Sequence, residues 1–203
     1  MKAISLFASG GIGDLALKAN GIDVLIANEL LEDRCKVLEY NYPDTEVIQG
    51  DIWIKKDEII QKTKNKLKGE ILDILYATPP CQGMSKNGRG TILSNVRKGL
   101  RPHIDERNRL IIPVIEIAKK LRPKLILLEN VPEMQDTIIE TPNGEYKLIL
   151  DYIKDELGSS YVGCGEVVEF ADYGVPQKRQ RLISIFSRET SLKDFFKITK
   201  TFL

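Results

Sequence analysis

The sequence contains little of the chemistry on which metal enzymes and secreted proteins depend. Its 203 residues include one histidine and three cysteines. The cysteines are odd in number and widely separated, so they provide neither a disulfide framework nor paired metal ligands. A single histidine excludes a histidine-rich metal site. These scarcities favour a reduced, cytoplasmic protein that uses no catalytic metal.

The sequence also lacks a long apolar run and a strong excess of charge. No stretch is long enough to span a bilayer, and strand-like residues begin directly after Met1, which leaves no room for a signal peptide. The net charge is +1, so any nucleic-acid binding would depend on a local basic surface. With 42% hydrophobic residues, we expect one well-buried domain and no membrane association.

Short β-rich runs alternate with helical patterns along most of the chain. Helical spacing covers residues 30–40, 55–67 and 110–121. Strand–helix alternation predicts an α/β fold, in which a mostly parallel sheet carries helices on both faces. The predicted strands are residues 3–8, 23–28, 46–48, 73–77, 124–129, 162–170 and 181–186.

Residues 82–109 differ from the rest, being rich in glycine, serine, asparagine and basic side chains. They predict a long loop, and residues 86–109 hold seven basic against two acidic side chains, a local charge of +5. Such a segment can follow phosphates without reading sequence. A solvated loop without function has the same composition. The tail, residues 189–203, has no clear strand or helix partner.

Polar and glycine residues follow the first three predicted strands. The glycines in residues 9–13 suit a ligand that approaches bare backbone, and they equally suit a tight turn without ligand. Glu29 ends the second strand, where a carboxylate can accept from both ribose hydroxyls or begin a helix. Asp51 and Ile52 follow the third strand and could hold an adenine amino group and ring face. These strand ends would line one crevice.

Reactive side chains follow the later strands. Residues 79 and 80 are prolines that present Cys81 just beyond the fourth strand. A lone cysteine is more often a small buried hydrophobe, but basic groups beside it would favour a nucleophilic thiolate. Glu129 ends the fifth strand, as a capping acid or a catalytic one. Arg179 and Arg181 lie on one side if their segment is a strand, which could equally be a solvated basic edge.

In this order the motifs resemble the cytosine-C5 DNA methyltransferase family. The resemblance runs from residue 6 to about residue 188 and implies a Rossmann-like S-adenosylmethionine-dependent methyltransferase fold with a seven-stranded sheet. The implied cofactor-binding and catalytic domain is residues 1–188. The motifs are Phe-Ala-Ser-Gly-Gly, Pro-Pro-Cys-Gln, Glu-Asn-Val and Gln-Lys-Arg-Gln-Arg, with Asp-Glu-Arg-Asn at residues 105–108 before Leu110.

The resemblance also implies a mechanism and its residues. The Cys81 thiolate would add to C6 of a cytosine flipped out of double-stranded DNA, Glu129 would stabilise N3, Arg181 would bind O2, and Arg179 would brace the site. S-adenosylmethionine would supply the methyl group. The implied cofactor contacts are Phe7, Ser9, Gly11, Ile12, Glu29, Leu30, Asp51, Ile52, Pro80 and Leu110. The implied DNA contacts are Gln82, Ser85, Lys86, Arg89 and Arg97.

Members of this family normally continue into a target-recognition region and a final segment that completes the cofactor pocket. We expect residues 189–203 to lead toward such a region, absent from this sequence. The chain would then need a missing C-terminal half or a second subunit, and alone it would bind DNA weakly and methylate poorly. The resemblance places it in DNA methylation, of the kind found in restriction–modification systems.

Three other functions fit parts of the same sequence less well. An amino-group methyltransferase needs a polar residue and an aromatic platform around the two prolines, where this chain has Thr78 and Cys81. The tRNA-methylating branch of the same family shares the cysteine chemistry, although residues 82–85 are more typical of the DNA enzymes. A non-catalytic binding module would be expected if Cys81, Glu129 or Arg181 were replaced, and all three are present.

Overall fold

The computed structural model describes residues 1–80 and 105–188 of the chain. Its first half contains β1 (Lys2–Leu6), α1 (Ile12–Ala19), β2 (Asp23–Glu29), α2 (Glu32–Asn41), β3 (Glu46–Gln49), α3 (Ile52–Leu67) and β4 (Ile74–Ala77). The second half contains the 3-10 helix η1 (Glu106–Leu110), α5 (Ile111–Leu121), β5 (Leu125–Asn130), η2 (Pro132–Asp136), β6 (Ile138–Glu140), β7 (Tyr146–Leu148), α6 (Ile149–Leu157), η3 (Gly158–Ser160), β8 (Val162–Glu169), η4 (Phe170–Asp172) and β9 (Gln180–Ser187).

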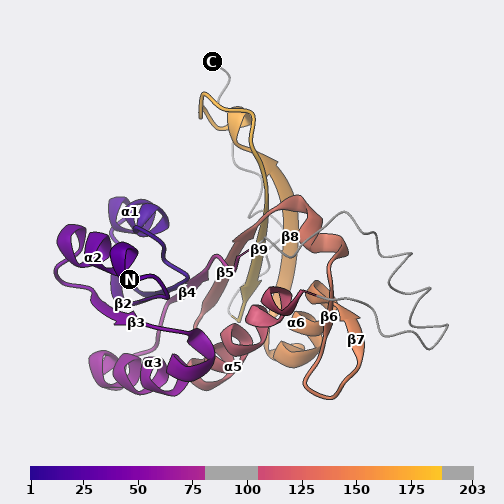
Figure 1. Cartoon of the computed structure of the whole chain (residues 1–203), viewed down its shortest axis with the longest axis horizontal. Helices are drawn as coiled ribbons and strands as arrows, with labels where there is room; N and C mark the ends of the chain where they lie inside the picture. Colours follow the sequence, from indigo (N-terminus) through magenta and orange to yellow (C-terminus); the bar gives the residue numbers. More distant parts are fainter. Residues whose placement is uncertain (81–104, 189–203) are drawn as a thin grey trace.

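The centre of the molecule is a seven-stranded sheet in the order β3-β2-β1-β4-β5-β9-β8 (Figure 1). The strands from β3 to β5 are parallel to their neighbours, whereas β9 runs antiparallel to both β5 and β8. The prediction of a mostly parallel seven-stranded α/β fold is therefore confirmed. Strand order reverses between β1 and β4, and open α/β sheets bind ligands at such a switch point.

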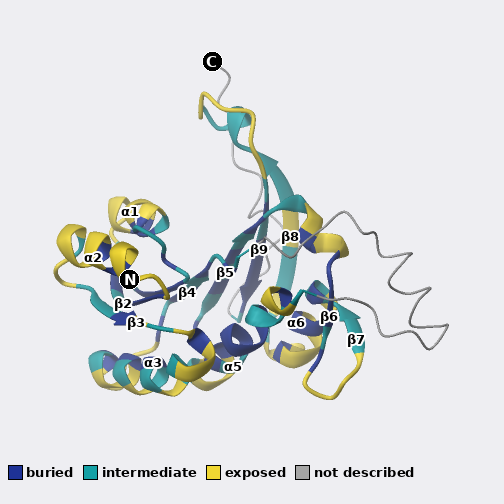
Figure 2. Cartoon of the chain, viewed as in Figure 1, coloured by how far each residue is buried: buried dark blue, intermediate teal, exposed yellow. Residues whose placement is uncertain are grey.

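Helices cover the sheet from two sides. Residues of α3, α5 and α6 join the largest buried cluster on one face, while α1 and α2 lie on the other side of β1, β2 and β3 (Figures 1 and 2). In β5, successive side chains point to opposite faces of the sheet and pack in a different cluster on each face. Ile126 and Leu128 are buried in the large cluster, whereas Leu125 and Leu127 pack with Leu17 of α1 in a second cluster.

The predicted strands all form, with ends shifted by at most two residues. The first ends at Leu6, two residues early, because Phe7 takes a left-handed backbone conformation with φ 58°. The helix predicted from residue 55 begins at Ile52 because the Asp51 carboxylate caps its N-terminus. The helix predicted from residue 30 begins at Glu32, since Leu31 is still extended.

Two features differ from the sequence prediction. Part of the predicted loop is helical: residues 106–109 belong to η1, because the Asp105 Oδ1 atom accepts a hydrogen bond from Arg107 N at 2.9 Å and starts the turn. The remaining loop residues, 82–104, and the tail, 189–203, lie outside the described residues. The small β6–β7 hairpin was not predicted.

Within the part of the chain that the structure describes, no helix is both long and apolar enough to cross a membrane. The same residues contain no cluster of three or more His, Cys, Asp or Glu side chains arranged to hold a metal ion.

Gly13→Ala is expected to destabilise the fold by about 1–2 kcal/mol, because a Cβ atom at this position would overpack a filled contact. That atom would lie 2.4 Å from Cε1 and 2.6 Å from the hydroxyl oxygen of Tyr76. Chemical denaturation measures the change. The matched control is Gly10→Ala in the turn before α1, whose Cβ would meet Val37 at an ordinary 3.4 Å. Equal stability of the two variants would contradict the close packing of α1 on β4.

Candidate active site

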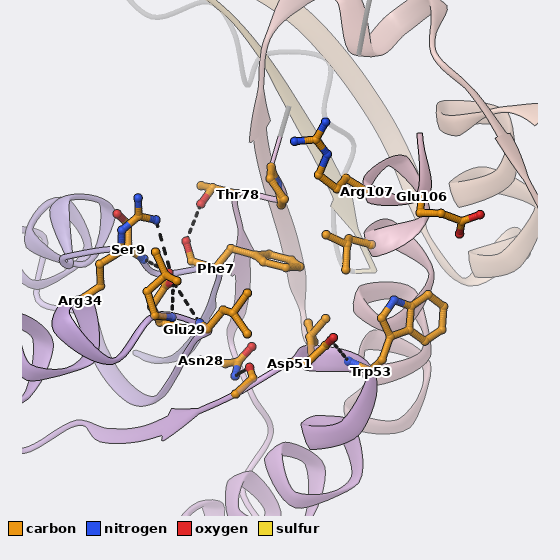
Figure 3. Close-up of a pocket in the computed structure, with 16 residues that line it drawn as sticks. Phe7, Ser9, Asn28, Glu29, Arg34, Asp51, Trp53, Thr78, Glu106 and Arg107 are labelled. Carbon is orange, nitrogen blue, oxygen red and sulfur yellow. Dashed lines mark hydrogen bonds and ion pairs between the residues drawn. The ribbon is translucent and has the colours of Figure 1, made fainter. Parts of the chain in front are cut away.

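A cavity of about 650 Å³ opens at the carboxyl ends of β1 to β4 (Figure 3). Its volume lies within the range of roughly 300–1,000 Å³ that small-molecule sites occupy. The turns after β1, β2 and β3, the residues that follow β4, and η1 form its wall. The wall combines the apolar side chains of Phe7 and Leu110 with the carboxylates of Glu29 and Asp51.

The turn after β1 holds the backbone in a conformation that residues other than glycine rarely adopt. Phe7 and Ser9 have φ angles of 58° and 52°. Contacts from neighbouring strand ends hold this turn: the Thr78 hydroxyl donates to Phe7 O at 3.0 Å, and Ser9 N donates to Glu29 Oε2 at 2.8 Å. The turn thereby directs the Phe7 ring toward the middle of the cavity (Figure 3).

Glu29 is only 5% exposed, and its carboxylate is largely used by backbone amides. Oε1 accepts from Leu30 N at 2.9 Å and from Leu31 N at 3.0 Å, while Oε2 accepts from Ser9 N. Since a carboxylate offers about four acceptor sites, one site on Oε2 remains. Glu29 therefore stabilises the start of α2 and can also take one ligand hydroxyl. A second hydroxyl would have to share an oxygen with a backbone amide.

The end of β3 is held in place by Asn28 and presents Asp51. The Asn28 side-chain amide donates to Ile48 O at 2.8 Å and to Gly50 O at 3.1 Å. Asp51 then caps α3, because its Oδ1 atom accepts from Trp53 N at 2.9 Å. Its Oδ2 atom is not used by this cap, so the carboxylate keeps an acceptor for a ligand at the cavity wall.

Of the ten residues expected to contact a cofactor, all except Gly11 and Ile12 line this cavity. Gly11 caps α1 with φ 84°, and its carbonyl oxygen accepts from the Tyr42 hydroxyl at 2.6 Å. A Cβ atom on Gly11 would lie 2.3 Å from the Tyr42 ring. Ile12 is 81% exposed on α1. The packing of the turn therefore accounts for the glycine, and Ile12 does not line the cavity.

The end of β5 fixes the segment that leads to Cys81. The buried Asn130 amide donates to Pro79 O at 3.0 Å, and its Oδ1 atom accepts from Val131 N at 2.8 Å. Pro80, the next residue, lines the cavity. Cys81 itself lies outside the described residues, as do all five predicted DNA contacts, Gln82, Ser85, Lys86, Arg89 and Arg97.

Glu129 and Arg181 meet at the same end of the sheet. Arg181 Nε lies 2.8 Å from Glu129 Oε1, and the two side chains are 17% and 26% exposed. The pair leaves Glu129 Oε2 available to a third partner. Arg179 is not brought to this pair by any contact of the described residues: it precedes β9, is exposed, and donates its backbone N–H to Glu169 Oε1 at 2.6 Å. Arg179 lies before the first residue of β9, so the alternation of side chains along this strand does not place it on the same side as Arg181.

Tyr76 contributes an uncharged phenol next to Glu129. Burial, followed by the negative charges of Glu129 and Asp14, raises the pKa of Tyr76 to about 12. Burial also raises the pKa of the Asp14 carboxyl, although a hydrogen bond from Ser5 acts in the opposite direction. The phenol thus stays protonated at neutral pH and places no second anion beside Glu129.

Sequence reasoning missed three residues that shape the site. Trp53 lines the cavity, Thr78 holds the turn at Phe7, and Asn130 ties β5 to the Pro-Pro segment. The signal for Asn130 was available, because a buried amide directly after a catalytic-type carboxylate needs hydrogen-bond partners. The position of Trp53 depends on where α3 begins, which the helical spacing placed three residues too late.

Comparisons with known proteins agree with this geometry. The family described as C-5 cytosine-specific DNA methylase matches residues 1–202. The "Type II methyltransferase M1.HgaI" of Avibacterium volantium is 39% identical over 180 residues, which are 89% of this chain and 48% of that protein. The "Type II methyltransferase M.AquIA" of Picosynechococcus sp. is 30% identical over 191 residues, 92% of this chain and 72% of the relative.

A solved structure shares the fold. A putative DNA modification methyltransferase encoded within an Escherichia coli prophage superposes with a TM-score of 0.75 at 24% identity, covering all of this chain and 52% of the other. The chain thus spans about half the length of this protein and of the Avibacterium relative.

Proposed function

The chain belongs to the C-5 cytosine-specific DNA methylase family, and on that premise we propose that it transfers a methyl group from S-adenosylmethionine to C5 of cytosine in double-stranded DNA. One observation carries the proposal. Asn130 joins the Pro-Pro segment before Cys81 to the strand end that bears the Glu129–Arg181 pair. Nucleophile, acid and base-binding arginine would thereby face the same crevice as the cavity.

The cavity fits S-adenosylmethionine by the chemistry of its wall. The remaining acceptor site of Glu29 suits a ribose hydroxyl, Asp51 Oδ2 suits the adenine amino group, and Phe7 and Leu110 offer apolar surface to the base. The acidic side chains also favour the positive sulfonium. When bound there, the cofactor supplies an electrophilic methyl group.

The residues of the chain divide the remaining chemistry. The Cys81 thiolate adds to C6 of the flipped cytosine, which makes C5 nucleophilic enough to take the methyl group. Glu129 donates to or shares a proton with N3 through its available carboxylate oxygen, and Arg181 binds O2 while holding Glu129 in place. Loss of the C5 proton and elimination then free Cys81. Arg179, which precedes β9, braces the site.

DNA binding falls to the segment after Cys81. We assign phosphate contacts to Lys86, Arg89 and Arg97, and contacts near the flipped base to Gln82 and Ser85, because the local charge of residues 86–109 is +5. Residues 1–188 would form the catalytic domain, and the tail, 189–203, would lead to target recognition. A C-terminal half or second subunit would supply that recognition and complete the cofactor pocket.

Methyl transfer tests the proposal directly. The chain is incubated with methyl-tritiated S-adenosylmethionine and either duplex DNA or tRNA, alone and together with the C-terminal half of a longer relative. We expect weak incorporation into DNA by the chain alone, a large increase with the added half, and recovery of the label as 5-methylcytosine. Label in tRNA instead, or in N4-methylcytosine or N6-methyladenine, would contradict the proposal. No effect of the added half would contradict the second-subunit interpretation alone.

A further inference from the structure

Trp53 is the single tryptophan of the chain and lines the cofactor cavity. It follows Gly50, Asp51 and Ile52, which also line the cavity, so four consecutive residues form this part of the wall. Asp51 and Trp53 lie next to each other there (Figure 3). We propose that the Trp53 indole stacks on the adenine base of the cofactor, while Asp51 accepts its amino group. This inference rests on the proposed function, whose adenine site it completes.

The backbone of Trp53 is fixed before any ligand binds. Asp51 Oδ1 accepts from Trp53 N at 2.9 Å and thereby sets the first turn of α3. The same carboxylate thus fixes the tryptophan and faces the cavity with its second oxygen. A base that donates its amino group to Asp51 would therefore meet an aromatic wall at a defined place.

A lysine side chain also approaches the indole ring. Lys56 Nζ lies 5.9 Å from the ring centroid, and Lys56 is not part of the cavity wall. The Lys56 ammonium is ion-paired with Glu116 of α5, which ties the cation to a second helix. A cation over an aromatic face attracts it. Lys56 therefore contacts the ring without lining the cavity that would hold the base.

The neighbouring side chain shows that this arrangement is particular to Trp53. Ile54, the next residue of α3, is 79% exposed and does not line the cavity, whereas Trp53 is 36% exposed. The flat aromatic side chain of Trp53 thus lies in the same part of the cavity wall as the Asp51 carboxylate, which can accept a hydrogen bond from an amino group. Bases stack on such surfaces because each base presents a π-face.

The test compares two ligands that differ only in the base. Binding of S-adenosylhomocysteine and of S-ribosylhomocysteine, which lacks adenine, is measured by calorimetry for wild type, Trp53→Ala, Trp53→Phe and the control Ile54→Ala. Trp53→Ala should weaken the adenosyl ligand about 10-fold, within the range of base–aromatic stacking. It should leave the ribosyl ligand unchanged. Trp53→Phe should retain most of the affinity, and Ile54→Ala all of it.

Tryptophan fluorescence tests the stacking of Trp53 separately from the cofactor site itself, since Trp53 is the only tryptophan in the sequence. S-adenosylhomocysteine should quench the emission of the wild type, and S-ribosylhomocysteine should not. If the wild type binds S-adenosylhomocysteine without quenching, and Trp53→Ala binds it equally well, the stacking inference is wrong while the cofactor site stands. If the wild type binds neither ligand at millimolar concentration, the proposed cofactor site itself is wrong.

Discussion

Replacing Cys81 with serine should abolish methyl transfer and covalent capture of DNA that contains 5-fluorocytosine. A serine hydroxyl provides no anion near neutral pH, so addition to C6 should fall on the order of 10³-fold or more. Wild type with S-adenosylmethionine and the C-terminal half of a longer relative should give a protein–DNA adduct that survives denaturing electrophoresis. The adduct accumulates because fluorine replaces the C5 proton whose removal would release the thiol.

The other two cysteines provide the control. Burial raises the pKa of the Cys164 thiol, with a further contribution from Glu166. Burial also raises the pKa of Cys35, and its Sγ atom donates to Glu29 O at 3.5 Å. Both environments disfavour a thiolate. Cys164→Ser should therefore form the adduct normally, and an adduct that survives Cys81→Ser would disprove the nucleophile. A non-catalytic binding module would give no adduct even in the wild type.

The sheet was predictable because each strand carries its own signal. Buried parallel strands form short apolar runs, and the end of each run marks the edge where ligands bind. The last residue of a strand is harder to predict where a contact with a distant residue determines it. Residues 7 and 8 continue the apolar run of β1, but Thr78 and Glu29 hold this turn in a conformation that ends the strand. Composition alone carries no trace of those contacts.

The β6–β7 hairpin illustrates a signal that was present and not used. Its strands have three residues each, too few for a recognisable alternation. Between them, Pro142, Asn143 and Gly144 form a turn in which Gly144 has φ 79° and donates its N–H to Thr141 O at 2.9 Å. A Pro-Asn-Gly sequence favours such a turn. Turn chemistry would have found this element where periodicity could not.

The candidate site was predicted in parts rather than as a whole. The strand-end acids Glu29, Asp51 and Glu129 were named from their positions, and each lies at the expected edge of the sheet. The sequence did not predict how they are held. Three backbone amides surround Glu29, and a single guanidinium contact orients Glu129. The Leu30 and Leu31 amides follow Glu29 directly, but Ser9 and Arg181 come from distant segments, so only the folded structure brings these two to the acids.

Glu129→Gln should reduce methyl transfer by about 10²–10⁴-fold, the usual contribution of a positioned proton donor or acceptor. The amide keeps the shape of the side chain, and its oxygen can still accept from Arg181 Nε, so the pair remains connected. The substitution removes the negative charge and the ability to exchange a proton with N3. Single-turnover rates with saturating S-adenosylmethionine and DNA measure the change.

The affinity for S-adenosylhomocysteine should stay within about 2-fold in the same variant, because Glu129 does not line the cavity proposed to bind the cofactor. Glu133→Gln, an exposed acid in η2, is the matched control and should keep the wild-type rate. If Glu129→Gln retained more than half the rate, the ion pair with Arg181 would be structural. If instead the rate and the cofactor affinity fell together, Glu129 would act on the cavity rather than on the base. Loss of rate with intact cofactor binding is the result that assigns Glu129 to the cytosine.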